Sequence, residues 1–341
     1  LRICVNEQHP LVLLGKSDAE VSGSRGFTHA AFTRNNGYYS RIFHNRPFYK
    51  YSIKKILGIG GFGRTYLAES IWTQENFAIK EYFPNDWAVR SEDGISLRAF
   101  DETKRSFYEH GLSVFVNEAK ILKNLREDDV IVDVKDFFYE NNTGYIVMEY
   151  IQGCTLAQYM QRQNSIIPLD MAEVIIISVA KSMSKIHRLG LLHRDISPDN
   201  IMLLEDGSIK LIDFGATRQY ALNETTDMSV MIKPGFAPME QYSRTGKQGP
   251  WTDVYALAAT YYFIVSGKRP LTAVDRCAGE QQLSLSSVNS NVPEELSEVI
   301  DCALELDYSV RIQNMEEFVR EFETAYRCSA DIPVDVYPHI T

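Results

Sequence analysis

Short runs of alternating apolar and polar residues, separated by glycine or polar turns, begin at Tyr51. Alternation with a period of two is typical of β-strands that bury one face. A longer segment then places its apolar residues at helical spacing, and two more alternating runs follow it. The pattern predicts three strands, one helix and two further strands, at Tyr51–Leu57, Arg64–Glu69, Asn76–Tyr82, Phe107–Leu125, Val130–Tyr139 and Gly144–Glu149.

After Gly153 the spacing becomes that of amphipathic helices, which we predict at Leu156–Gln163, Met171–Arg188, Thr252–Ser266, Pro293–Leu306 and Met315–Tyr326. Only two brief strands are predicted in this part, at Ile201–Leu204 and Ile209–Ile212. The expected fold is therefore α+β and bilobal, with a small antiparallel β-rich lobe holding one main helix and a larger, mostly helical lobe. A hinge is expected near Glu149–Gly153, and clefts between lobes are frequent ligand sites.

Composition narrows the class of protein. With 341 residues, 45% hydrophobic and 23% charged, the chain is long enough for one large bilobal domain and is not disordered as a whole. The net charge of −10 gives no basic footprint for nucleic acid, although residues 1–50 carry 7 basic and 3 acidic residues. This basic stretch either docks on the acidic body or a partner, or is simply solvated.

Cysteine usage and hydropathy bear on the compartment. The five cysteines form no CxxC pair, which favours a reducing compartment over a disulfide scaffold. The longest apolar runs are shorter than the roughly 20 residues that a membrane span needs. We therefore expect a cytoplasmic protein without a membrane span in this chain.

A glycine-rich segment, Gly58-Ile59-Gly60-Gly61-Phe62-Gly63, lies between two predicted strands. In dinucleotide-binding folds such glycines open a helix, whereas here a strand follows them. A glycine loop between antiparallel strands is able to fold over a nucleotide, because its bare backbone approaches phosphates closely. A glycine-rich hairpin without a ligand is the alternative.

Lys80 lies on the strand that follows, in the run Phe77-Ala78-Ile79-Lys80, where it alternates with apolar residues. A lysine that points into a cleft is desolvated and needs an anionic partner, for which Glu118 on the predicted helix is suitable. Held in this way, Lys80 would contact nucleotide phosphates without losing its charge. A surface lysine on an edge strand is the alternative.

The segment from His193 to Asn200 is followed, 13 residues later, by Asp213-Phe214-Gly215. Magnesium prefers oxygen ligands and is often held by one or two carboxylates or amides together with substrate phosphates. Asn200 and Asp213 flank a predicted hairpin and fit that role, while Asp195 is suited to accept or orient a hydroxyl proton. Each acid alone has an alternative role as a turn or cap residue, but their joint spacing indicates phosphate chemistry.

Together these motifs resemble the eukaryotic-type protein kinase family, most closely the bacterial Ser/Thr kinases, from about Tyr49 to Tyr326. The resemblance implies the bilobal kinase fold, ATP as a bound nucleotide and Mg²⁺, or Mn²⁺ in its place. It implies that Lys80 pairs with Glu118 and holds the α- and β-phosphates, that Asn200 and Asp213 bind the metal, and that Asp195 positions the substrate hydroxyl.

Further positions are assigned only by this resemblance. Met148 corresponds to the gatekeeper, Asp253 to the residue that holds the catalytic-loop backbone, and Glu240 to the partner of Arg311 that braces the activation segment. The nucleotide-binding positions that it implies, around the phosphates and the base, are Gly58, Gly60, Gly61, Phe62, Gly63, Ala78, Lys80, Met148, Glu149, Ile151 and Met202.

The chain departs from the family pattern at the catalytic loop. Ser197 stands where Ser/Thr kinases usually carry lysine, and Lys233 stands where they usually carry threonine. We expect Lys233 to reach back toward Asp195 and Ser197, and thereby to restore a cation near the transferred phosphoryl group. The alternative is a substrate-facing surface lysine. Thr65 and Thr155 also replace family residues and would retune nucleotide affinity.

The second departure is a gap of 38 residues between Lys80 and Glu118, about twice the family spacing, which predicts an insertion at about 81–112. Its aromatic residues favour a packed element that controls Glu118 or covers the sheet edge. The expected organisation is an N-terminal extension of unknown role at 1–48, which either packs on the kinase or ends a truncated domain, an N-lobe at 49–151, a C-lobe at 152–328 and an irregular tail at 329–341.

The sequence predicts a protein kinase that transfers the ATP γ-phosphoryl group to Ser/Thr hydroxyls of proteins and phosphorylates itself. Activation-loop candidates for phosphorylation, which Arg194 would receive, are Ser229 first, then Thr226, with Thr225 and Thr217. A pseudokinase scaffold and a small-molecule phosphotransferase are the alternatives. The protein substrate, the upstream signal and the oligomeric state stay open.

Overall fold

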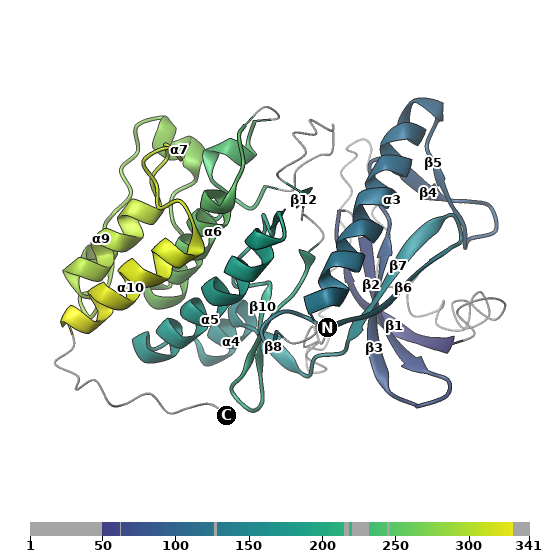
Figure 1. The fold of residues 1–341 in the computed structure, drawn as a ribbon, viewed down its shortest axis with the longest axis horizontal. Helices are drawn as coiled ribbons and strands as arrows, with labels where there is room; N and C mark the ends of the chain where they lie inside the picture. Colours follow the sequence, from purple (N-terminus) through teal and green to yellow (C-terminus); the bar gives the residue numbers. More distant parts are fainter. Residues whose placement is uncertain are drawn as a thin grey trace, which may run out of the picture.

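The computed structural model describes residues 50–61, 63–125, 128–214, 218–219, 232–243 and 246–329. Two lobes lie side by side, a β-rich N-lobe and a mainly helical C-lobe (Figure 1). The predicted α+β bilobal fold is therefore confirmed. The predicted extension at 1–48 lies outside the described residues, as does the predicted tail apart from Ser329, the last residue of the final helix.

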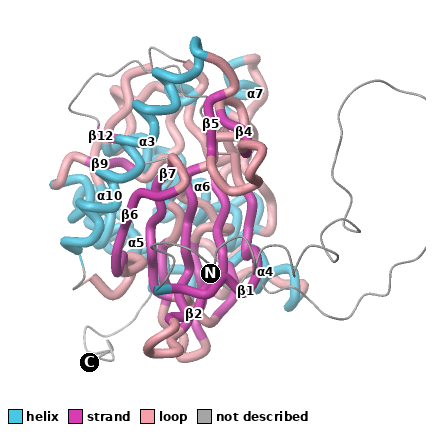
Figure 2. Tube along the Cα trace, turned by 90° about the vertical axis from the view of Figure 1, so that its right-hand side faces the viewer, coloured by secondary structure: helices cyan, strands magenta, loops and turns pink. Residues whose placement is uncertain are grey.

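The N-lobe is built on one antiparallel sheet with the strand order β1-β2-β3-β7-β6. Figure 2 shows these strands side by side. Asn141 and Asn142 join β6 to β7 with positive φ angles of 53° and 58°, as a two-residue hairpin requires. The bounds are β1 Tyr51–Ile59, β2 Gly63–Ser70, β3 Asn76–Tyr82, β6 Val134–Glu140 and β7 Thr143–Glu149.

Helix α3, Glu102–Leu122, packs on one face of this sheet, with Phe115 and Val116 in the core. The predicted start at Phe107 was wrong by five residues. The first turn of α3 is polar and exposed, so its sequence has no apolar periodicity that would predict a helix there. Asp101 caps this turn by accepting a hydrogen bond from the Lys104 N–H at 3.0 Å. The end at Leu125 was also wrong, because 123–125 form a 3₁₀ turn.

The predicted strand at Val130–Tyr139 begins only at Val134. Ahead of it, the Asp128 carboxylate accepts hydrogen bonds from the backbone N–H groups of Val130 and Ile131, at 3.0 and 3.2 Å. The same carboxylate accepts from Ser182 Oγ and contacts the Lys185 amine, both on a C-lobe helix. Ile131 also pairs with Leu211 of β11 in an isolated parallel bridge, so the segment that follows α3 is joined to the C-lobe by side-chain and backbone contacts.

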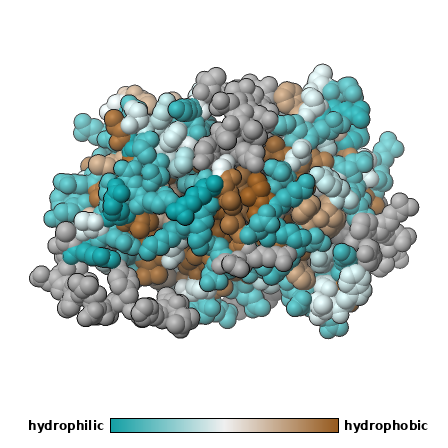
Figure 3. Space-filling model, in the orientation of Figure 1, coloured by the Kyte–Doolittle hydropathy of each residue, from teal (hydrophilic) through white to brown (hydrophobic). Residues whose placement is uncertain are grey.

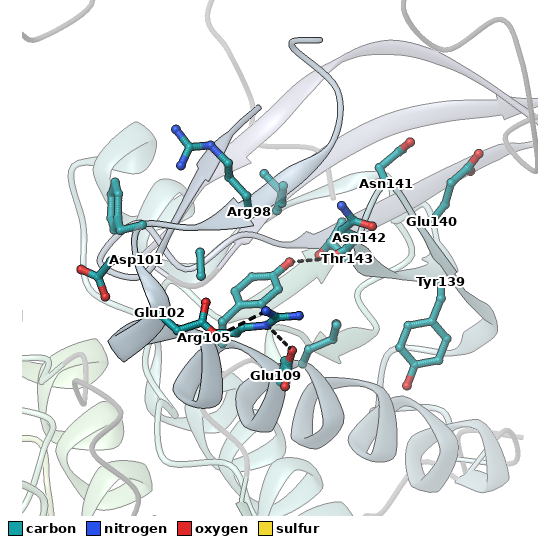
Figure 4. Close-up of a pocket in the computed structure, with 15 residues that line it drawn as sticks. Arg98, Asp101, Glu102, Arg105, Glu109, Tyr139, Glu140, Asn141, Asn142 and Thr143 are labelled. Carbon is teal, nitrogen blue, oxygen red and sulfur yellow. Dashed lines mark hydrogen bonds and ion pairs between the residues drawn. The ribbon is translucent and has the colours of Figure 1, made fainter. Parts of the chain in front are cut away.

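The predicted insertion contains a small hairpin, β4 Ala88–Arg90 and β5 Leu97–Ala99, ahead of the extended α3. Phe83 and Trp87 are buried, whereas Phe100 is exposed. Between β5, α3 and the β6–β7 turn lies a pocket of about 830 Å³, whose lining includes Arg105 between Glu102 and Glu109 (Figure 4).

The C-lobe is arranged around helix α6, which is buried along nearly its whole length. Its predicted helices are confirmed with ends within three residues of the prediction, and two short helices were not predicted. The elements are β8 Gly153–Thr155, α4 Leu156–Gln163, α5 Leu169–Arg188, β9 Leu191–Leu192, β10 Ile201–Leu204, β11 Ile209–Leu211, β12 Arg218–Gln219, η5 Met239–Gln241, α6 Pro250–Ser266, α7 Ala273–Cys277, α8 Leu285–Val288, α9 Glu294–Ala303 and α10 Met315–Ser329.

The surface in the orientation of Figure 1 is mainly hydrophilic, with hydrophobic side chains gathered near the middle of this face (Figure 3). Within the described part of the chain, none of the helices has both the length and the apolar run that crossing a bilayer requires.

Candidate active site

The glycine-rich loop joins β1 to β2. Gly58 lies in β1 and Gly63 opens β2, and the Gly60 N–H donates to the Gly63 carbonyl at 2.8 Å. A Cβ on Gly63 would lie 2.6 Å from the Glu81 carbonyl oxygen, so β3 leaves no room for a side chain there. Phe62, another predicted nucleotide contact, lies outside the described residues.

A residue that the sequence did not single out holds this loop. The Asn85 side-chain amide donates to the Gly60 carbonyl at 3.1 Å, and its backbone N–H donates to the Gly61 carbonyl at 3.0 Å. Asn85 is the third residue after the end of β3, so the first residues of the predicted insertion are tied to the glycine loop. No motif in the sequence signals this contact, because both acceptors are backbone atoms.

Lys80 on β3 lies between carboxylates. Its amine forms an ion pair with Asp213, not with Glu118. Burial lowers the pKa of Lys80, but the charges of Asp213, Glu118 and Asp195 outweigh burial and raise it overall. The predicted direct pair with Glu118 is therefore absent from the described ion pairs, because Asp213 occupies the amine.

Glu118 is nevertheless part of this site. It is buried on α3, and burial raises the pKa of its carboxyl well above the usual range, opposed by the charge of Lys80 and reinforced by that of Asp213. A carboxylate is stable in such surroundings only beside a cation. Glu118 thus faces the same charge cluster as Lys80 without touching its amine.

The catalytic-loop backbone is held from α6. The buried Asp253 carboxylate accepts hydrogen bonds from the N–H groups of His193 and Arg194, both at 2.8 Å, and lies 2.8 Å from His187 Nε2. Burial raises the pKa of Asp253, but hydrogen bonds and the charges of the two histidines lower it overall. The role predicted for Asp253 is confirmed.

Asp195 and Asn200 form one rigid pair. The Asn200 side-chain amide donates to Asp195 at its backbone carbonyl, 2.7 Å, and at its carboxylate, 2.8 Å. Burial raises the pKa of Asp195 to about 6, although the charge of Lys233 and the bond from Asn200 lower it. An acid with a pKa near the working pH is suited to exchange a proton.

The oxygens of Asn200 and Asp213 fit a magnesium ion. Because the Asn200 amide nitrogen is directed at Asp195, the amide oxygen is the atom that remains for a ligand. The Ile212 N–H donates to the Asn200 carbonyl at 2.8 Å, which links the two strands, and Asp213 has a left-handed φ of 66°. No group of three or more acidic, histidine or cysteine residues that could hold a metal occurs among the described residues. Mg²⁺ is often held by one or two protein oxygens together with substrate phosphates, and the oxygens of these two side chains fit that pattern.

Lys233 reaches the catalytic loop. Its amine donates to Ser197 Oγ at 2.8 Å and forms an ion pair with Asp199, and its charge lowers the pKa of Asp195. The predicted approach to Ser197 is confirmed, and the side chain does not extend as a free surface lysine. A role for Asp199 was not predicted from the sequence. Its only signal was its position two residues after Ser197, the serine that replaces the family lysine.

Side chains predicted around the base are buried in the large hydrophobic core that runs through both lobes. Ala78 lies opposite Met148 in the β3–β7 pairing, and both join Met202 of β10 and Ile151 in the same hydrophobic core. Ala78 and Met202 are fully buried. Apolar residues at the predicted base-contacting positions therefore come from both lobes.

The hinge itself is anchored by Glu149. Its carboxylate accepts a hydrogen bond from the Asp133 N–H at 2.8 Å and forms an ion pair with Lys210 of β11, also at 2.8 Å. Nearby, Thr155 caps α4 by accepting from the Gln158 N–H at 3.2 Å. The sequence predicted Glu149 only as a nucleotide-binding position and did not signal this link between the lobes.

The segment that ends the activation loop is braced as predicted. Arg311 donates to both carboxylate oxygens of Glu240, at 2.7 and 3.2 Å, and both side chains are buried. Thr252 Oγ1 adds a hydrogen bond to Glu240 at 3.0 Å. The candidate phosphorylation sites Thr217, Thr225, Thr226 and Ser229 lie outside the described residues.

Comparison with known proteins identifies the family of this domain. The model of the protein kinase domain family matches residues 51–322. Serine/threonine-protein kinase D of Synechocystis is 30% identical over 83% of this chain and 53% of its own length. Serine/threonine-protein kinase PrkC of Bacillus subtilis is 28% identical over 81% of this chain and 40% of its own length.

A solved structure named PpkA-294 apo form is 32% identical, covers 80% of this chain and 96% of its own, and superposes with a TM-score of 0.68. The chain belongs to the protein kinase domain family. It spans about half or less of the length of the curated relatives it matches first, so the family assignment applies to the domain.

Proposed function

We propose that this domain transfers the γ-phosphoryl group of ATP to serine or threonine hydroxyls of proteins, with Mg²⁺ or Mn²⁺ as the metal. The observation that carries the proposal is the convergence of Lys80, Asp195, Asn200 and Asp213 in one connected site. The names of the relatives, which are serine/threonine-protein kinases, support the same acceptor. A small-molecule phosphotransferase is disfavoured by the Glu240–Arg311 brace.

Each group has a defined task in this proposal. The substrate hydroxyl oxygen forms a bond to the γ-phosphorus as the bond to the β–γ bridging oxygen breaks, and the hydroxyl proton passes to Asp195. Lys80 holds the α- and β-phosphates, and Asn200 and Asp213 hold the metal through oxygen atoms. A bound metal neutralises charge on the phosphates. Glu118 supports the charge of Lys80.

The first test is transfer from radiolabelled ATP to a generic protein substrate with Mg²⁺. Asp195→Asn is expected to lower kcat by about 10²–10⁴-fold, because a positioned proton acceptor contributes that much. Lys80→Met is expected to raise the KM for ATP and to lower kcat, whereas Glu205→Gln, an exposed acid after β10, serves as the unchanged control. Nucleotide binding without any transfer by the parent protein would favour the pseudokinase alternative.

Phosphoamino-acid analysis of the same reaction tests the acceptor. We expect phosphoserine and phosphothreonine on the substrate and on the enzyme itself. Phosphotyrosine as the main product would contradict the assignment.

We further propose that Lys233 supplies the cation that the family usually places at position 197. Its contacts with Ser197 and Asp199 support this exchange. Lys233→Met is expected to lower kcat by about 10²-fold or more, as the loss of one preorganised charge in a catalytic site does. Lys268→Met, at an exposed site after α6, is the matched control.

The exchange also predicts a rescue. Ser197→Lys combined with Lys233→Thr should recover much of the kcat that Lys233→Met loses, because the lysine and the hydroxyl then exchange their positions in the same contact. Equal activity of Lys233→Met and the parent protein would assign Lys233 to the surface, as in the alternative drawn from the sequence.

We also propose a cytoplasmic location, for which the support is the need for ATP and the five cysteines, which form no CxxC pair. Protein substrates, and no nucleic acid, are the partners proposed with this activity; the acidic net charge of −10 supports the exclusion. Expression of the whole protein with a fluorescent tag would test the location directly.

A further inference from the structure

The pocket of about 830 Å³ between the inserted hairpin, α3 and the β6–β7 turn contains none of the residues assigned to catalysis (Figure 4). We call it the insertion pocket, because ten of the fifteen residues that line it lie within the predicted insertion at about 81–112. The family pattern therefore does not supply this pocket. Its volume falls within the range of about 300–1,000 Å³ that is typical of ligand sites.

Hydrogen bonds join the walls of the insertion pocket, so its shape exists before a ligand binds. The Leu97 N–H of β5 donates to the Asn141 carbonyl of the β6–β7 turn at 2.8 Å. The Tyr108 hydroxyl of α3 donates to the Asn142 carbonyl of the same turn at 2.7 Å (Figure 4). Leu97 and Tyr108 are themselves buried and give the lining an apolar part. Walls that are already fixed lower the ordering cost of binding.

Two aromatic side chains in the lining remain exposed. Phe100, just after β5, is 48% exposed, and Tyr139, near the end of β6, is 56% exposed. Aromatic residues are enriched at protein interfaces, where a covered ring buries roughly 150–250 Å². Because these two rings come from distant parts of the sequence and line one cavity, a ligand in the pocket gains apolar contact with both walls.

The lining is also acidic, with four carboxylates and two arginines, a balance of −2. Arg105 donates to Glu109 at 3.0 Å and to Glu102 at 3.3 Å, so two carboxylates share one positive charge. The side chains of Glu109 and Glu102 are 63% and 83% exposed, so a further cation can reach them from solvent. Glu140 adds a carboxylate beside Tyr139 at the other wall. Charge complementarity therefore favours a cationic ligand.

We propose that the insertion pocket binds a basic peptide segment of a partner protein, in which arginine or lysine lies beside an aromatic or aliphatic anchor. The cations of this peptide pair with Glu102 and Glu109, and one of them lies over the Tyr139 ring, where cation–π attraction adds to the ion pairs. The anchor covers the apolar part of the lining. This inference is independent of the proposed function, because it uses none of the catalytic groups.

The test is a selection of phage-displayed random nonapeptides on the full chain, without nucleotide. It is repeated on two variants, Glu109→Lys in the pocket and Glu205→Lys at an exposed acid after β10. Both variants change the net charge equally, so a difference between them reports the pocket and not the acidic charge of the whole chain. Circular dichroism confirms that each variant is folded.

We expect the parent chain and Glu205→Lys to enrich the same peptides, rich in arginine or lysine and carrying an aromatic residue or leucine. Glu109→Lys should lose this enrichment. Three results would overturn the proposal: no enrichment on the parent chain, enrichment of acidic peptides, or equal enrichment on Glu109→Lys. If Glu109→Lys does not fold, Glu140→Lys takes its place with the same outcomes.

Fluorescence anisotropy with the most enriched peptide then tests the contact with the exposed ring. Tyr139→Ser should raise the Kd by about two- to tenfold, as the loss of a cation–π contact does. Leu283→Ser is the matched control, because this C-lobe leucine is 59% exposed and lies outside the pocket, and it should leave the Kd unchanged. An equal Kd for Tyr139→Ser and the parent chain would contradict binding in this pocket.

Discussion

Among the described residues, each lobe contains a glutamate–arginine ion pair with a buried carboxylate, and the two pairs differ in how completely the arginine is satisfied and shielded from water. In the C-lobe, Arg311 donates to Glu240 and to the backbone carbonyls of Glu305, Trp251 and Leu306. The arginine side chain is 0% exposed and that of Glu240 is 3% exposed. Every part of the guanidinium group is therefore engaged away from water.

In the N-lobe, Arg90 of the inserted hairpin forms an ion pair with Glu81 of β3. Glu81 also accepts hydrogen bonds from the hydroxyls of Tyr66 and Tyr145, at 2.7 and 2.9 Å. The carboxylate is 0% exposed, but the arginine side chain remains 18% exposed. Glu81 thus has two partners within the sheet itself, and Arg90 adds a third from the insertion.

This difference indicates on which of the two pairs the stability of the fold depends more. A buried charge that loses its only cation costs far more than one that keeps other donors. We therefore expect the C-lobe pair to be needed for folding, and the N-lobe pair to fasten an added element to a sheet that is already formed.

The largest effect is expected for Arg311→Met, which leaves the buried Glu240 with the Thr252 hydroxyl as its remaining described side-chain partner. The free energy of unfolding should fall by about 3–5 kcal/mol, measured by urea denaturation of the C-lobe transition. The double variant Glu240→Gln/Arg311→Met should lose less, because no uncompensated charge remains. Equal losses in the single and double variants would show that packing, not charge, dominates this pair.

Arg90→Met is expected to cost less, about 1–3 kcal/mol, because Glu81 keeps two tyrosine hydroxyls and the site lies next to water. The measurement is again the free energy of unfolding, with Glu81→Gln/Arg90→Met as the second arm of a double-mutant cycle. A loss as large as that of Arg311→Met would mean that the insertion is part of the N-lobe core.

The two pairs also show which contacts could be predicted from the sequence and which could not. Glu240 and Arg311 lie 71 positions apart, and they were paired in advance only because the family motifs fixed their places. Asp195, Asn200 and Asp213 were found in the same way, because short motifs with fixed spacing identify them. The lobes and most elements followed from apolar periodicity.

The insertion could not be predicted to this level. Nothing in the sequence distinguishes Arg90 from a surface arginine, because its partner Glu81 is an acid on a strand and its burial arises only when the hairpin folds over the sheet. The same holds for Asn85, whose acceptors are backbone carbonyls. The pairing of Lys80 with Asp213 in place of Glu118 depends on side-chain geometry that no motif encodes.

A third prediction concerns the contact between α3 and the insertion at Gly111. A Cβ there would lie 2.1 Å from the Tyr82 hydroxyl and 3.6 Å from the Trp87 ring. Gly111→Ala should therefore destabilise the protein by about 1–3 kcal/mol through overpacking, although alanine favours a helix over glycine by about 1 kcal/mol. Thermal unfolding measures the change.

The Tyr82 hydroxyl supplies a rescue for this variant. It is buried and has no hydrogen-bond partner among the described residues, so Tyr82→Phe alone should leave stability unchanged or slightly higher. Combined with Gly111→Ala, it removes the colliding atom and should restore most of the lost stability. If the double variant stays as unstable as Gly111→Ala, the helix and not the ring carries the strain.

The smallest effect is expected for Asn85→Ala, and it separates the stability of the insertion from its influence on the active site. The substitution removes the side-chain bond to the Gly60 carbonyl, worth about 0.5–1.5 kcal/mol, and leaves the backbone bond to Gly61. Because the glycine loop covers the phosphates in the proposed function, the KM for ATP should rise up to about tenfold with kcat and the unfolding temperature nearly unchanged. Asn76→Ala, at the exposed start of β3, is the control. A fall in the unfolding temperature without a change in KM would instead give Asn85 the same role as Arg90. Both residues would then stabilise the inserted hairpin without affecting the nucleotide site.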